Sequence, residues 1–173
     1  MESSVSTFNA GMRFGLFTGL ALIAFDLILY VAGLKDPADP NPVQHMAWII
    51  LIAGIIMGIK YFKDNNEGIM SLGEAMGSGT IVAVIAALIG AAYLILFLNF
   101  IDPAFIEEVR AVAKQQAMEQ NNLSEEDYEQ MAGMMNTFTS PTFLAISSVI
   151  IYAIIGAIIS LIGGLIMRSK SQV

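Results

Sequence analysis

The sequence contains no cysteine. This absence excludes disulfides, thiol nucleophiles and thiolate metal ligands in one step. Histidine occurs once, at His45, and the chain has neither a zinc signature nor a phosphate-binding loop. The sequence therefore offers no candidate catalytic, cofactor-binding or metal-binding residues, and we expect the protein not to be an enzyme and to use no cofactor.

Charged residues are also scarce. They make up 13% of the 173 residues, about half of what a soluble domain carries, whereas 56% of the residues are hydrophobic and the mean hydropathy is +0.70. The net charge of −7 argues against nucleic acid as a partner, because nucleic-acid binding depends on lysine and arginine that neutralise phosphates. The composition instead indicates a lipid bilayer as the surroundings of the chain.

Four apolar runs are long enough to cross the ~30 Å hydrocarbon layer of a membrane as helices. They predict an all-α fold: one integral membrane domain over residues 1–173, built as a bundle of four transmembrane helices. The expected spans are residues 14–34, 46–62, 77–101 and 142–167. Ser71 and Glu74 form a capping-box pattern before the third span, and Ser140 followed by Pro141 predicts the start of the fourth.

Small residues recur at four-residue spacing in these spans. Such rows let helix backbones approach closely, which is how membrane helices associate in lipid. We expect these positions to pack helix against helix: Gly11, Gly15, Gly19, Gly54, Gly58, Gly156, Ser160 and Gly164.

Asp26 interrupts the first run close to its middle. An acid inside a membrane span is costly and is a functional hypothesis by default, although it can also lock helix packing. Asp26 continues the glycine face of its helix, so it should face the bundle interior. Counting depth at 1.5 Å per residue gives three tyrosines as candidate partners: Tyr30, Tyr93 and Tyr152.

Two environments of Asp26 would have different consequences. In a dry site the carboxyl would stay neutral and act as a packing device, so that Asp26→Asn would change little. Beside a water-reachable cavity it could exchange a proton or cation. We favour the dry, structural alternative at this point.

Residues 102–140, between the third and fourth spans, predict an extramembrane helical hairpin. Apolar residues recur at helical spacing after Pro103, Asn121 and Asn122 interrupt the pattern, and Ser124 to Asp127 restarts it with a capping motif. The segment carries eight acidic and two basic side chains, a net charge of −6. This composition is typical of a solvated helix face, with a protein-partner surface or a cation site as alternatives. The methionines of its second helix, Met131, Met134 and Met135, should serve packing rather than recognition.

Lysine and arginine near the span ends predict the orientation. One side of the membrane holds five of them, and the opposite side holds Lys35, Arg110 and Lys114. The five are Arg13, Lys60, Lys63, Arg168 and Lys170. The count favours cytoplasmic termini and a periplasmic 102–140 segment.

The connection between the second and third spans resembles a family signature. It runs from Gly58 to Ala75 and includes Lys60, Lys63, Gly68, Ser71 and Glu74. In this stretch, in the four-span layout and in the short basic tail, the chain is similar to an uncharacterised bacterial family, domain of unknown function 4199. Its members are small four-helix proteins found mainly in Bacteroidetes-type bacteria. The resemblance implies a bacterial inner-membrane protein without established functional residues.

Three function classes remain open at this stage. The leading interpretation is a non-enzymatic scaffold, accessory subunit or envelope factor whose outer hairpin meets a protein partner. The alternative is a small ion-coupled transporter, assembled as a homo-oligomer, with Asp26 as the coupling acid. A membrane enzyme has the least support, because no catalytic set exists.

Overall fold

The computed structural model describes residues 5–121 and 124–169, without the side chains of residues 120 and 121. All regular elements in these ranges are helical, and the order is α1 (Thr7–Val31), the 3₁₀ helix η1 (Pro42–His45), α2 (Met46–Asp64), α3 (Leu72–Leu96), the π-helical turn η2 (Phe97–Ile101), α4 (Phe105–Asn121), α5 (Glu125–Phe138) and α6 (Pro141–Met167). Four of these helical segments are long and apolar enough to cross a membrane: Thr7–Val31, Pro42–Asp64, Leu72–Ile101 and Pro141–Met167. The protein is therefore a multi-pass membrane protein, as the composition predicted.

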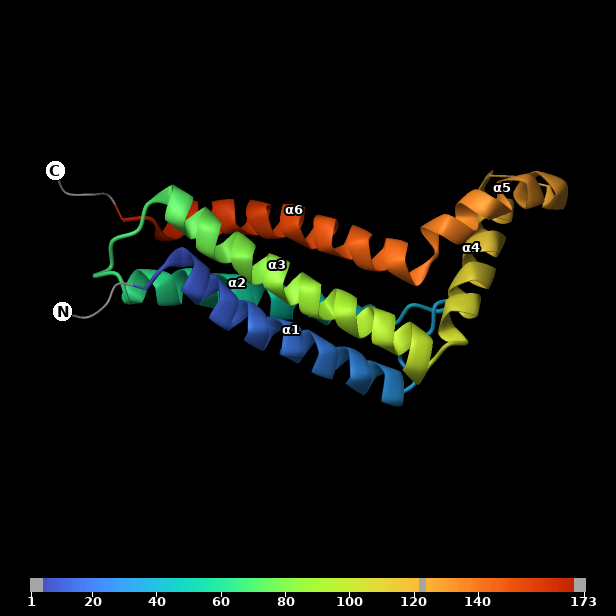
Figure 1. The fold of residues 1–173 in the computed structure, drawn as a ribbon, viewed down its shortest axis with the longest axis horizontal. Coiled ribbons are helices and arrows are strands. Elements are labelled where there is room, and N and C mark those ends of the chain that lie inside the picture. Colours follow the sequence, from blue (N-terminus) through green and yellow to red (C-terminus); the bar gives the residue numbers. More distant parts are fainter. Residues whose placement is uncertain (1–4, 122–123, 170–173) are drawn as a thin grey trace.

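The four long helices run alternately up and down, and α3 lies at the centre of their packing. It contacts α1 and α6 along most of its length and α2 less extensively. Both termini are at one end of the bundle, whereas α4 and α5 lie at the opposite end, with α4 running across the bundle axis (Figure 1). We call these two ends the terminal end and the hairpin end.

Helix caps explain where the spans begin and end. The Ser71 side chain and Glu74 form the predicted capping box at the start of α3, and Ser140 caps α6 with Pro141 in its first turn. The first span differs from the prediction of residues 14–34, because Ser6 caps α1 one residue before Thr7 and the helix ends at Val31. The other three spans match within about five residues.

All eight small residues predicted to pack helices lie at contacts between helices. A Cβ atom added to Gly11 or Gly15 would come within 2.6 Å of Ile81 or Ile85 on α3. Gly54 meets Thr18, and Gly156 meets Ala83. The remaining contacts are those of Gly19 with Ile89, Gly58 with Val82, Ser160 with Gly79 and Gly164 with Ala75. The helices thus approach too closely for larger side chains at these positions.

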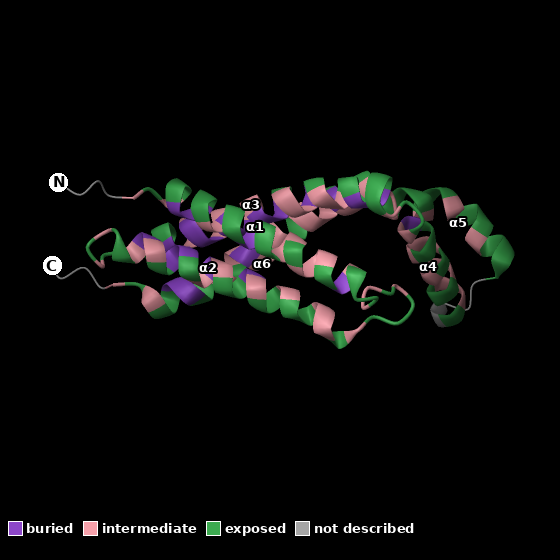
Figure 2. Cartoon of the chain, turned by 90° about the horizontal axis from the view of Figure 1, so that it is seen from below, coloured by how far each residue is buried: buried purple, intermediate pink, exposed green. Residues whose placement is uncertain are grey.

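Many of the buried residues lie in the half of the bundle next to the terminal end (Figure 2). The main core there includes Ile55, Ile59, Met70 and Ala75, each fully buried. A second, smaller cluster lies at the hairpin end, around Phe97, Leu98 and Ile106. Between the two clusters lies the region that contains Asp26.

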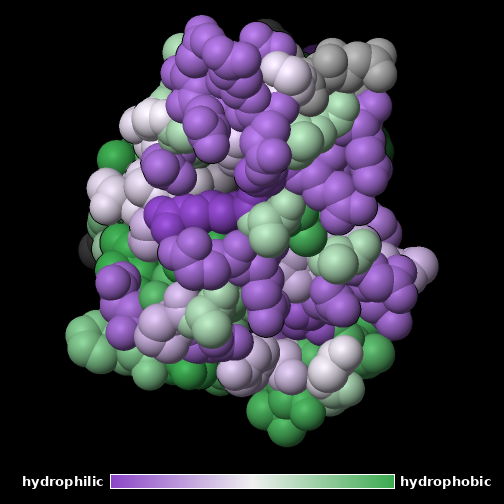
Figure 3. Space-filling model, turned by 90° about the vertical axis from the view of Figure 1, so that its right-hand side faces the viewer, coloured by the Kyte–Doolittle hydropathy of each residue, from purple (hydrophilic) through white to green (hydrophobic). Residues whose placement is uncertain are grey.

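The segment between the third and fourth spans forms two helices, as predicted. α4 ends at Asn121, and a Ser124–Asp127 capping box starts α5; the predicted break at Asn122 itself lies outside the described residues. Seen from the hairpin end, most of the surface is hydrophilic (Figure 3). The expectation that the methionines serve packing within the chain is wrong for Met131 and Met134, which are exposed on α5, a helix with few contacts to α4 and α6.

Candidate functional site

Asp26 lies on α1, five residues before the helix ends at Val31. At 1.5 Å per residue this is about 8 Å from the end of the helix. The expected position near the middle of the span is therefore wrong, because α1 begins and ends earlier in the sequence than the apolar run indicated. Asp26 therefore lies in the half of the bundle next to the hairpin end (Figure 1).

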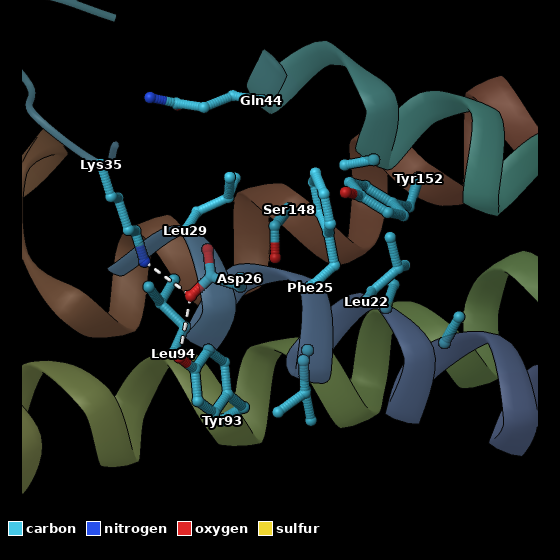
Figure 4. Close-up of a pocket in the computed structure, with 15 residues that line it drawn as sticks. Leu22, Phe25, Asp26, Leu29, Lys35, Gln44, Tyr93, Leu94, Ser148 and Tyr152 are labelled. Atoms are coloured by element: carbon cyan, nitrogen blue, oxygen red, sulfur yellow. Dashed lines mark hydrogen bonds and ion pairs between the residues drawn. The ribbon is translucent and has the colours of Figure 1, made fainter. Parts of the chain in front are cut away.

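Two side chains donate to the same oxygen of Asp26. The Tyr93 hydroxyl donates to Oδ2 at 2.8 Å, and the Lys35 ammonium donates to it at 2.7 Å (Figure 4). Asp26 faces α3 on the continuation of the Gly11–Gly15–Gly19 row, so it faces inward as predicted. Among the described residues, no hydrogen bond to Oδ1 is formed.

Lys35 is the partner that sequence reasoning missed. It was assigned to the outer loop only as a charge that sets orientation. In the structure, Gly33 adopts a left-handed conformation (φ 68°) and the amides of Gly33 and Leu34 bond to the carbonyls of Tyr30 and Leu29, which is a Schellman motif. This motif turns the chain back over the last turn of α1 and returns Lys35 to Asp26. The sequence does contain a signal for this turn, because a glycine at the end of the helix, Gly33, precedes Lys35 by two residues.

The Lys35 ammonium also lies over aromatic rings. Its Nζ is 4.0 Å from the centroid of Phe97 and 5.2 Å from that of Phe105, both within the range of a cation–π interaction. Phe97 is fully buried, and the Tyr30 ring packs edge-on against it at 5.0 Å. Tyr30 thus supports the aromatic wall and forms no hydrogen bond with Asp26.

A cavity of about 270 Å³ opens beside the Asp26–Lys35 pair. Its lining comes from α1, α2, α3, α6 and the α1–α2 connection, and it is largely apolar. Six polar side chains border it: Asp26, Lys35, Gln44, Tyr93, Ser148 and Tyr152. Tyr152 lines the cavity and stacks on Trp48, with ring centroids 5.6 Å apart, but it does not bond to Asp26.

The dry environment of Asp26 that we favoured stays a prediction, and the structure adds that the Asp26–Lys35 pair is not fully buried within the bundle. The Asp26 side chain retains 32% of its accessible surface and Lys35 retains 16%, because the cavity beside them is open to the exterior of the bundle. The geometry is that of an ion pair at the edge of a cavity.

The described residues contain no cluster of three or more histidine, cysteine, aspartate or glutamate side chains placed to hold a metal ion. The polar groups of the cavity are instead one acid, one base, an amide and three hydroxyls. These groups suit the binding of a small polar or charged molecule by hydrogen bonds and ion pairing.

Comparison with known proteins identifies a family. The family model described as "Protein of unknown function (DUF4199)" matches residues 13–169, which is most of the chain. No curated protein and no solved structure matches.

Proposed function

Because the chain belongs to the family described as protein of unknown function DUF4199, we propose its function from the geometry of the cavity: it is a non-enzymatic carrier of a small solute, in which Asp26 is the coupling acid. The observation that carries this proposal is the open cavity bordered by an ion-paired carboxylate inside a membrane helix. Intramembrane acids that line a cavity characteristically mark substrate and ion pathways.

The packing of the two halves supports this assignment. A carrier needs a site that is reached from one side while the other side is closed. In the half next to the terminal end, fully buried Ile59, Met70 and Ala75 close the bundle, whereas the cavity is open in the other half. In a carrier, this arrangement would be the state in which the half next to the terminal end is closed.

Reconstitution into proteoliposomes with a trapped pH-sensitive dye tests the proposal. The external probes are sodium, potassium, alkylammonium ions, amino acids and short carboxylates, each added against an imposed proton gradient. We expect one class to change the internal pH in wild-type vesicles and none to do so with Asp26→Asn. Lys114→Ala removes a lysine of the hairpin and should transport normally. A wild-type protein that responds to no probe would contradict the carrier assignment.

We further propose that the protein resides in a bacterial inner membrane with cytoplasmic termini. The support is the excess of lysine and arginine at the terminal end, where Lys63 donates to the Met167 carbonyl and Arg13 to the Tyr61 hydroxyl; Lys170 lies outside the described residues. Single cysteines at positions 120 and 170 should label oppositely with an impermeant reagent in intact cells. Labelling at 170 alone would reverse the orientation.

A second candidate function rests on the hairpin. Met131, Met134 and Phe138 leave an exposed apolar stripe on α5, beside many acidic side chains, and such Met-rich faces adapt to protein partners. In this alternative the protein is a scaffold or accessory subunit, as a single chain or as a homo-oligomer. A photo-crosslinker at residue 134 should then capture a defined product in native membranes. The same probe at residue 130 should not, and equal labelling from both positions would contradict a specific surface.

A further inference from the structure

The Lys35 ammonium occupies a site whose other parts stand on helices. Asp26 Oδ2 receives it at 2.7 Å, the Phe97 ring lies 4.0 Å from it, and the Phe105 ring lies 5.2 Å away. A carboxylate combined with aromatic faces is the chemistry that recognises ammonium groups. The three groups together form a site for a cation, and the chain itself supplies the cation that fills it.

Lys35 is the part of this arrangement that is free to leave. Asp26 belongs to α1, and Phe97 is fully buried at the start of η2. Lys35, in contrast, stands on the non-helical α1–α2 connection and reaches the site through a flexible four-carbon side chain. Close to the end of the bundle, such a side chain can extend to the membrane surface instead. When it does so, Asp26, Tyr93 and Phe97 remain in place.

We propose that this site binds the ammonium group of a small amine with an apolar body, and that Lys35 is a tethered occupant that such an amine displaces. The inference rests on the proposed function and names its substrate class. Exchange of one ammonium for another keeps the carboxylate paired, so no charge is left uncompensated in the membrane. Tyr93 continues to donate to Asp26 in both states.

The cavity next to the pair suits the rest of such a molecule. Leu22, Ile23, Leu29 and Ala47 provide an apolar lining, and its volume of about 270 Å³ is slightly below the range of ~300–1,000 Å³ for drug-sized ligands. A short alkyl or aromatic body therefore fits, and a large lipid does not. An anion would have to take Lys35 from Asp26 and would meet the aromatic faces, which repel negative charge.

Trp48, the single tryptophan of the chain, provides the signal for a test. It stacks on Tyr152, which lines the cavity, so ligand entry should change its fluorescence. Protein in lipid nanodiscs is titrated with hexylammonium, hexanol and hexanoate, which share a chain length. We expect hexylammonium to bind Lys35→Ala at least about tenfold more tightly than wild type, because removal of a tethered competitor removes its high effective concentration.

Three further variants and measurements define the outcome. Lys114→Ala should bind like wild type, and the double variant Asp26→Asn/Lys35→Ala should lose the preference for hexylammonium over hexanol. If Lys35→Ala does not fold alone, hexylammonium and not hexanol should restore its folding yield, because a ligand that binds only the folded state stabilises it. Equal binding of hexanol and hexylammonium to Lys35→Ala would overturn the proposal. Tighter binding of hexanoate than of hexylammonium to the wild-type protein would also overturn it.

The two assignments fail separately. If the protein transports a solute class other than amines and Asp26→Asn abolishes this transport, the amine proposal is wrong and the carrier assignment stands. If hexylammonium binds but no probe is transported, the ammonium site stands and the carrier assignment is wrong.

Discussion

The two halves of the bundle use the same helix faces for different purposes. On α1, the face that presents Gly11, Gly15 and Gly19 next to the terminal end presents Asp26 closer to the hairpin end. On α6, the buried Ser160 and Gly156 give way to Tyr152 and Ser148. Small residues bring the helices together in one half, and larger polar residues border a cavity in the other. Side-chain size along one face thus determines where the bundle is closed and where it is open.

The largest effect is expected from filling the closed half. A Cβ added to Gly11 would lie 2.5 Å from Ile81 Cβ and 2.8 Å from the Ser78 carbonyl oxygen, so Gly11→Ala must push α1 away from α3. We expect it to lower the free energy of unfolding by about 1–3 kcal/mol, as overpacking does. Thermal unfolding in nanodiscs measures the change.

The control for that variant is a glycine of the open half. Gly90 lines the cavity, and a Cβ added to it would meet no atom within 4 Å. Gly90→Ala should leave stability unchanged or raise it by up to about 1 kcal/mol, since alanine favours helix more than glycine does. Equal losses from both variants would remove the distinction between the halves.

A smaller effect is expected from the ion pair of the open half. Asp26→Asn and Lys35→Met should each lower stability by about 1–2 kcal/mol, because each leaves a partly buried charge without its partner. The double variant should lose less than the sum of the two, with a coupling energy of about 1 kcal/mol, in keeping with partial exposure. Additive losses would mean that the pair seen at 2.7 Å contributes nothing.

The smallest effect on stability is expected from removing a helix cap, and two similar caps of the chain can be compared. Ser71 and Ser124 both form capping boxes, with Glu74 and Asp127, but Ser71 starts α3 of the bundle and Ser124 starts α5 of the hairpin. Ser71→Ala should lower global stability by about 1 kcal/mol. Ser124→Ala should reduce helicity near α5 in hydrogen exchange and leave the unfolding temperature unchanged. A shift of that temperature by Ser124→Ala would show that the hairpin unfolds together with the bundle.

Periodicity and composition predicted the elements well and the cavity poorly. The spans, both capping boxes and the two-helix hairpin follow from local patterns, because a membrane helix must be apolar over its length and capped at its ends. Counting depth along the helices gave three candidate tyrosine partners of Asp26, and one of them, Tyr93, donates to it. Lys35 did not follow, because a lysine after the span is read as a loop charge unless the turn at Gly33 is taken into account.

The open environment of Asp26 also could not be read from the sequence. Whether polar residues at one depth enclose a dry hydrogen bond or border a cavity depends on how far apart the backbones stand. Tyr93, Tyr152 and Gln44 come from three different elements, and no local pattern records their spacing. The exposure of Met131 and Met134 could not be predicted from a local pattern either, because it depends on where α5 lies relative to its neighbours.

Two serines on α6 test the central claim that the cavity is reached by water. Ser148 lines the cavity, and Ser160 is fully buried in the closed half. In this cysteine-free chain, Ser148→Cys and Ser160→Cys can be treated in nanodiscs with a charged, membrane-impermeant thiol reagent, with Glu129→Cys on the hairpin as the exposed reference. We predict that Ser148→Cys reacts at a rate approaching the reference and that Ser160→Cys stays unmodified. A Ser148→Cys variant as unreactive as Ser160→Cys would contradict the account.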